Sequence, residues 1–256
     1  MFATPKSILV LLMAVSLLYS FGVTPSIRAF AAEPQITPSG RALGNMLDSM
    51  RVEDLWLAGH HINWKTGLPA GRPYSKKGAH THCSAFVAAV AYQLGIYILR
   101  PPDHPQTLLA NAQVDWLQAE GPSYGWRQVE SGEQAQELAN EGFLVVAGYK
   151  NSDPKKSGHF VVVRPFAKSK EMLREEGPQV IQAATYNLSS TSLRRAFRYH
   201  RGALEGGEIR FFAHTIPAAR LSRFLSVQRE VPFFSQGWRV CRRGNAPCGV
   251  QAQSGY

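Results

Sequence analysis

Two residues in this chain are suited to nucleophilic catalysis as a nucleophile and its base, and the first is a cysteine at the start of an apolar segment. Cys83 opens a segment that runs to Leu94 and is followed by Gly95, a common helix stop. Phe86, Val90 and Leu94 recur every four residues, which predicts a helix that is apolar nearly all round and therefore buried. Unpaired N–H groups and the helix dipole lower the pKa of a cysteine at a helix N-terminus. We therefore expect Cys83 to be a nucleophile; the alternative is a structural core cysteine.

The second residue is a histidine that could act as the base, since a cysteine nucleophile needs a group to accept its proton. Among the eight histidines, His159 is the best placed, because it follows Gly158 at the start of the apolar run 160–163. The alternative is a strand-end histidine without a role. Gln182 lies on a later apolar run and could orient His159 by accepting from its Nδ1–H. Because strand register cannot be read from the sequence, Asn187 remains the alternative orienting residue.

The elements that must position these residues are predicted from hydrophobic spacing. The runs 143–147 and 159–163 are apolar on successive residues, which predicts an antiparallel hairpin covered on both faces. The segment 60–77 is rich in Gly, Pro and polar residues and is expected to be a loop. Helices before strands indicate an α+β fold. We expect helices over 40–57, 83–94, 106–118, 132–140 and 168–176, and strands over 143–147, 159–163, 180–184 and 208–214.

The first residues have the pattern of a secretory signal peptide. Lys6 precedes an apolar run over 8–23, and Ala29-Phe30-Ala31 forms a small-residue cleavage site. The alternative is a membrane anchor, for which the run is short. The expected organisation is a signal peptide over 1–31, a hydrolase domain over 32–220 and a C-terminal extension over 221–256. No later stretch is long and apolar enough to predict a membrane span.

The chain is strongly basic, with a formal net charge of +10. Lys6 and Arg28 lie in the predicted leader, so the mature chain would carry +8. Such a charge favours anionic partners. The basic residues are scattered and no nucleic-acid motif is present, so we expect affinity for a wall or surface rather than for nucleic acid. The oligomeric state is left open.

The remaining cysteines lie in the C-terminal extension. Cys241 and Cys248 flank a short segment with Gly and Pro, and in an oxidising compartment we expect them to form a disulfide. Cys83 is then the odd cysteine, which in a secreted protein is either an intermolecular partner or a reactive thiol.

Taken in order, these residues resemble a known enzyme family. Tyr74, Cys83-Ser84-x-Phe86-Val87, Gly95-Ile96, Leu99-Arg100, Gly158-His159-x-Val161 and Val180-Ile181-Gln182-Ala183 follow the pattern of NlpC-type cysteine peptidases and the related CHAP amidases, over roughly 68–184. Those proteins are papain-like enzymes that cut peptidoglycan. Two departures are His82 where the family usually has Asp, and Gln182 where it often has His.

The resemblance implies a fold, a site and a partner. The fold would be papain-like, with N-terminal helices and a buried nucleophile helix packed on a mostly antiparallel sheet. The enzyme would be a secreted or periplasmic bacterial amide hydrolase that acts on peptidoglycan or its stem peptides and needs no cofactor. The catalytic residues would be Cys83, His159 and Gln182, and Tyr74 and Ser84 would bind substrate, although Tyr74 can also be read as an ordinary loop tyrosine.

Other functions fit some of the same residues. His80-Thr81-His82-Cys83, with His60-His61 nearby, could hold zinc, although a metal on Cys83 would occupy the nucleophile. A non-catalytic secreted protein that binds the wall or neutralises a toxin fits the charge and the leader equally well. A papain-like acyltransferase would use the same catalytic residues. The sequence leaves open which amide bond is cut.

Overall fold

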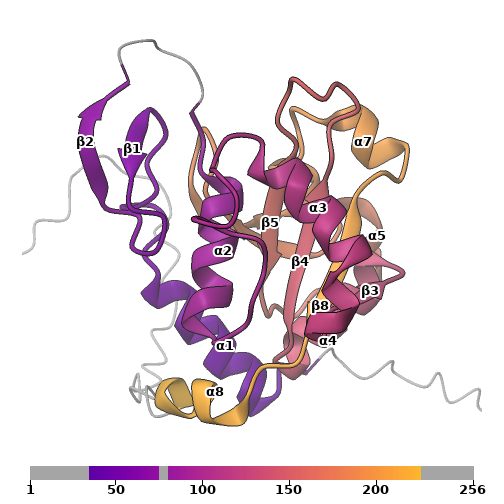
Figure 1. Cartoon of the computed structure of the whole chain (residues 1–256). Coiled ribbons are helices and arrows are strands. Elements are labelled where there is room, and N and C mark those ends of the chain that lie inside the picture. Colours follow the sequence, from indigo (N-terminus) through magenta and orange to yellow (C-terminus); the bar gives the residue numbers. More distant parts are fainter. Residues whose placement is uncertain (1–34, 75–79, 226–256) are drawn as a thin grey trace, which may run out of the picture.

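The computed structural model describes residues 35–74 and 80–225, and its centre is an antiparallel sheet with helices on both faces (Figure 1). The strands of this sheet follow the order β3-β8-β4-β5-β6-β7, and β1 and β2 form a separate pair. The fold is α+β, as the sequence predicts. The strands are β1 His60–Ile62, β2 Pro69–Pro73, β3 Arg127–Val129, β4 Leu144–Tyr149, β5 His159–Val163, β6 Gln179–Gln182, β7 Leu188–Ser192 and β8 Arg210–His214. The helices are α1 Pro38–Ser49, α2 Cys83–Gln93, α3 Leu109–Ala119, the 3-10 turn η1 Gly121–Tyr124, α4 Gly132–Glu141, α5 Lys170–Glu176, α6 Leu193–Ala196, α7 Arg201–Glu205 and α8 Ala218–Leu225.

The central hairpin of the sheet is β4 and β5, paired antiparallel with Tyr149 opposite His159. Every residue of both strands is buried, so the predicted hairpin with two covered faces is confirmed. Alternate residues point to opposite faces of a sheet. One face, with Val146 and Val162, packs against α1, α2 and α3, and the other, with Val145 and Val163, packs against α4, α6 and α7.

Helix α2 is the buried helix that the sequence predicts. Residues 83–91 are all buried, and the ring of Phe86 packs edge-on against Trp56 with centroids 5.1 Å apart. The helix ends at Gln93, and Gly95 follows with φ of +72°, a conformation that favours glycine. Burial on all sides fixes the position of Cys83 at the start of the helix.

Some predicted boundaries are wrong. The first helix was expected over 40–57 but ends at Ser49, because Arg51 adopts a positive φ of 51° that cannot continue an α-helix. It begins earlier than expected, at Pro38, because the Thr37 side chain accepts from the Gly40 N–H and caps the helix. The expected loop over 60–77 contains β1 and β2. Strand β7 was not predicted, because Leu188–Ser192 has no apolar alternation.

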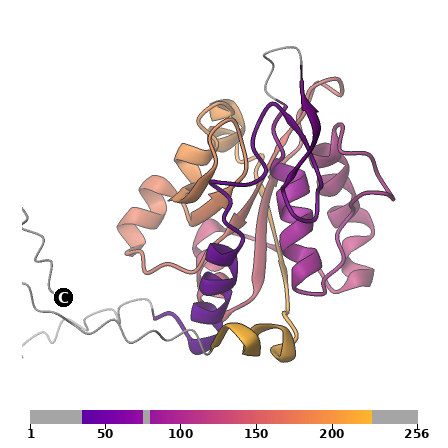
Figure 2. The same cartoon turned by 90° about the vertical axis from the view of Figure 1, so that its left-hand side faces the viewer.

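Helix α8 lies against α1 at the end of the described chain (Figures 1 and 2). Asn45 donates to the Phe224 carbonyl at 3.1 Å, and Leu221 is buried in the same core as α1 and α2. The predicted signal peptide, the Cys241–Cys248 pair and the extension beyond residue 225 lie outside the described residues. None of the helices in the described ranges has the length and apolar character needed to cross a bilayer.

Candidate active site

The start of α2 and the start of β5 meet, and this contact brings Cys83 beside the strand that carries His159. Cys83 is 5% exposed and His159 is 6% exposed. The Phe160 N–H, one residue beyond His159, lies close enough to the Cys83 sulfur to influence its pKa. No hydrogen bond joins the Cys83 and His159 side chains, both of which are in the described part of the chain. Both side chains therefore lie buried where α2 and β5 meet.

The pKa of the Cys83 thiol is raised, which corrects the expectation of a lowered value. Burial is the main cause, since it disfavours the charged thiolate. The N–H groups of Phe160 and Ser84, the N–H of Cys83 itself and the Ser84 hydroxyl act in the opposite direction without cancelling the effect of burial. Because the helix is covered on every side, desolvation outweighs the favourable helix N-terminus.

The His159 ring is held by Gln182. The distance from His159 Nε2 to Gln182 Oε1 is 3.1 Å, and both side chains are buried. Gln182 Nε2 donates to the Tyr186 carbonyl at 3.1 Å, which directs Oε1 toward the imidazole. His159 Nε2 must then carry the hydrogen, and Nδ1 is left with a free lone pair. The sequence prediction paired Gln182 with Nδ1–H, whereas the contact is made through Nε2.

Asn187, the alternative orienting residue, is occupied elsewhere. Its Nδ2 donates to the carbonyls of Val52 and Leu55, each at 2.7 Å, and its Oδ1 accepts from the Ala184 N–H at 3.0 Å. Asn187 therefore ties the β6–β7 connection to the segment after α1.

Burial also lowers the pKa of His159, to about 4. The hydrogen bond that His159 donates to Gln182 raises this pKa, and the neighbouring His200 lowers it. The two imidazole rings lie with centroids 5.8 Å apart and planes 22° apart, and Phe197 contacts His159 edge-on at 4.9 Å. His159 is therefore neutral near pH 7, which is the protonation state that a base requires.

A buried asparagine holds the turn that precedes His159. Asn111, on α3, accepts from the N–H of Gly158 at 2.8 Å and from that of Asn151 at 3.1 Å, and it donates to the Lys156 carbonyl at 2.9 Å. A Cβ on Gly158 would lie 1.9 Å from the Tyr149 carbonyl oxygen, so only glycine fits there. Glycine at position 158 is thus a geometric requirement of this hairpin, and the role of Asn111 was not predicted.

A cavity of about 360 Å³ opens onto His159 and Gln182. Its far wall is formed by α6 and the residues after it, with Arg195, Arg198, Tyr199 and His200 lining the cavity. These residues were not predicted from the sequence, although Arg194-Arg195-Ala196-Phe197-Arg198 forms a visible basic cluster. The remaining lining residues are Thr81, Ser157, Gly158, Ala184, Thr185, Tyr186 and Ala196.

The two residues expected to bind substrate lie in different surroundings. The Ser84 hydroxyl lies near the Cys83 sulfur, and its carbonyl accepts from buried Gln113 at 3.2 Å. The Tyr74 ring stacks between His61 and His80, each 3.8 Å away between centroids. Tyr74 is not among the described residues that line the cavity beside His159.

The histidines of the zinc alternative make contacts other than metal ligation. His80 stacks on Tyr74, whereas His82 Nε2 lies 2.9 Å from the His60 carbonyl. Within residues 35–74 and 80–225, no group of three or more His, Cys, Asp or Glu side chains is placed to hold a metal ion.

Comparison with known proteins gives one relative at the sequence level. No family model matches the chain. The chain is 35% identical over 101 residues to the peptidoglycan amidase Tse1 of Pseudomonas aeruginosa. The aligned part is 40% of this chain and 53% of that protein, so the chain spans about half the length of the curated relative that it matches. The similarity is that of a distant homologue of a peptidoglycan amidase.

Proposed function

We propose that this protein hydrolyses an amide bond of peptidoglycan, with Cys83 as the nucleophile and His159 as the base. The observation that carries the proposal is the Gln182–His159 hydrogen bond beside the start of α2. Together with the similarity to an amidase, it supports a cysteine-dependent mechanism in a papain-like arrangement. The reaction would take place outside the cytoplasmic membrane, where peptidoglycan lies, in agreement with the predicted leader over 1–31.

In the proposed reaction, Cys83 Sγ attacks the carbonyl carbon of the amide as His159 Nδ1 accepts the thiol proton. The carbonyl oxygen becomes an oxyanion, which N–H groups in the first turn of α2 can stabilise. His159 Nδ1–H then protonates the leaving amine, the C–N bond breaks, and a thioester to Cys83 remains. Water, deprotonated by His159, attacks the thioester and releases the acid and the free thiol.

The protonation states suit general-base catalysis. A raised thiol pKa and a lowered imidazole pKa both favour the neutral pair. The thiol must therefore give its proton to His159 before or during the attack. Gln182 offers a hydrogen bond to the imidazolium but no charge, so it orients His159 without stabilising the ion as strongly as a carboxylate would.

The cavity beside His159 suits a negatively charged substrate. Arg195 and Arg198 line it, and arginine binds carboxylates through paired N–H donors. Peptidoglycan stem peptides carry such carboxylates. We therefore propose that a stem peptide occupies this cavity beside His159; Cys83 is buried next to it and is not among the described residues that line it.

The test is digestion of purified peptidoglycan by the full mature chain, followed by mass analysis of the soluble fragments. We expect new amine and carboxylate ends from wild type and none from Cys83→Ala, with urea denaturation of the variant as the check that it is folded. Full activity of Cys83→Ala would refute the mechanism. Activity that is lost with a chelator would favour the zinc alternative, and binding without cleavage by wild type would favour a wall-binding protein.

A further inference from the structure

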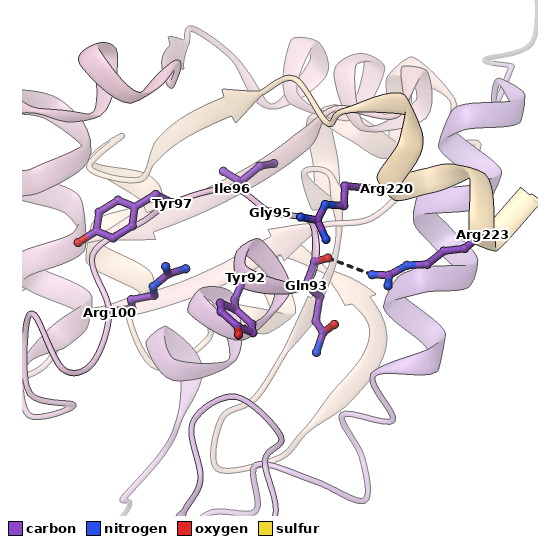
Figure 3. Close-up of a pocket in the computed structure, with 8 residues that line it drawn as sticks. All are labelled: Tyr92, Gln93, Gly95, Ile96, Tyr97, Arg100, Arg220 and Arg223. Atoms are coloured by element: carbon purple, nitrogen blue, oxygen red, sulfur yellow. Dashed lines mark hydrogen bonds between the residues drawn. The ribbon is translucent and has the colours of Figure 1, made fainter.

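A second cavity, of about 320 Å³, lies at the end of α2 opposite Cys83. Figure 3 shows that its walls come from three parts of the chain: the last turn of α2 with Tyr92, the following segment with Tyr97 and Arg100, and α8 with Arg220 and Arg223. The residues that line it include three arginines and no acidic residue.

The three guanidinium groups are held in different ways. Arg223 donates to the Gln93 carbonyl at 3.0 Å and so satisfies an acceptor at the end of α2. Arg100 lies 4.9 Å from the ring centroid of Tyr97 and 5.2 Å from that of Tyr92. Arg220 lies against Gly95, where a Cβ would approach its Nε to 2.9 Å. These contacts place the three guanidinium groups around the cavity.

Stabilisation of the α2 C-terminus accounts for only part of this arrangement. Favourable contact of a cation with a helix C-terminus explains Arg223. The guanidinium groups of Arg100 and Arg220 form no hydrogen bond and no ion pair with any residue of the described ranges. The nearby Asp103 carboxylate accepts from the Tyr97 hydroxyl at 2.7 Å, and burial together with Asp103 raises the pKa of Tyr97 to about 12. Within the described ranges, the hydrogen-bond donors of Arg100 and Arg220 are therefore not used by any other residue.

We propose that this cavity binds a phosphate group. A guanidinium group presents a planar fork of donors that matches phosphate oxygens two at a time. Guanidinium groups from two separate elements can bind different oxygens of one phosphate. A carboxylate has only two oxygens and therefore fits two guanidinium groups less well. The site is separate from Cys83 and His159, so the proposal does not depend on the proposed hydrolysis.

The test uses the full mature chain with two probes, because the phosphate could belong to a soluble molecule or to a lipid. Glycerol 3-phosphate is titrated by calorimetry, and vesicles of phosphatidylglycerol in phosphatidylcholine are used for co-sedimentation, both at physiological salt. The test variant carries both Arg100→Gln and Arg220→Gln. The control variant carries both Arg72→Gln and Arg210→Gln, which removes the same charge from exposed positions on β2 and β8.

We expect saturable binding of at least one probe, weakened tenfold or more in the Arg100 and Arg220 double variant and less than twofold in the control. Binding of glycerol 3-phosphate identifies a soluble source, and binding of vesicles alone identifies a lipid headgroup. Equal loss in both double variants, or no saturable binding by wild type, would overturn the proposal. Arg100→Lys, measured alone, keeps the charge and should still weaken binding at least threefold, because the planar fork is lost.

Discussion

Substitution of Gln182 by Ala and by Glu should move the acid limb of the pH–rate profile in opposite directions. Gln182 Oε1 accepts from His159 Nε2–H at 3.1 Å in a buried site. Removing this acceptor in Gln182→Ala leaves a buried donor without a partner, at a cost of about 1–3 kcal/mol. When this cost is added to the activation free energy, because the reactive orientation of the His159 ring is destabilised, kcat/KM drops roughly 5- to 150-fold. About 1.4 kcal/mol corresponds to a factor of ten.

The direction of each pH shift follows from the causes of the His159 pKa. Burial lowers this pKa to about 4, and the Gln182 hydrogen bond opposes burial. Loss of that bond in Gln182→Ala lowers the pKa further, so the acid limb moves to lower pH. In Gln182→Glu a carboxylate faces the imidazolium and should raise the pKa by about 1–3 units, so the acid limb moves to higher pH.

The assay is kcat/KM for a soluble stem-peptide fragment between pH 3.5 and 8, together with an NMR titration of the His159 ring in each variant. Asn187→Ala is the matched control, since it removes a neighbouring half-buried amide that contacts the Val52 and Leu55 carbonyls. A shift in the same direction in both Gln182 variants would refute the assignment. So would a shift in Asn187→Ala with none in Gln182→Ala.

Three further predictions concern stability. Asn187→Ala should lower the free energy of unfolding by about 1–3 kcal/mol, because the carbonyls of Val52 and Leu55 lose their donor; unchanged urea denaturation would contradict this. His159 has a pKa depressed to about 4 from 6.5, so the unfolded state binds more protons between these values and stability falls as pH falls through them. Wild type should lose about 3 kcal/mol more than His159→Gln over that range, measured by urea denaturation at each pH, and parallel curves would exclude a buried neutral histidine. Asn111→Ala should release the turn before β5, seen as faster amide exchange of Gly158 and Asn151; equal exchange rates in wild type and variant would show that Asn111 does not hold this turn.

The sequence predicted the elements whose signals are local. The apolar run after Cys83 and the two apolar runs around the β4–β5 turn have a period and length that leave little choice of element. Contact between His159 and Gln182 was also expected, with Asn187 as the alternative, because a buried glutamine on a strand must find a partner.

What the sequence could not predict depends on tertiary surroundings. The pKa of Cys83 was expected to fall, since the helix N-terminus is visible in the sequence but the depth of its burial is not. Asn111 is remote in sequence from Gly158, and nothing in its local pattern links them. Strand β7 is formed by pairing with β6 and not by its own hydrophobic alternation, so Leu188–Ser192 gave no signal.

The two outer strands of the sheet have a consequence for self-association. An unpaired strand edge can template pairing with a second chain and so lead to aggregation. One edge, β3, has only three residues. On the other edge, the Glu53 carboxylate accepts from the Ser189 N–H at 2.9 Å and from its hydroxyl at 2.6 Å, which places a negative charge where another strand would have to bond. Both outer strands of the six-stranded sheet are therefore poor templates for edge-to-edge pairing with a second chain, β3 because it is short and β7 because Glu53 occupies the Ser189 N–H.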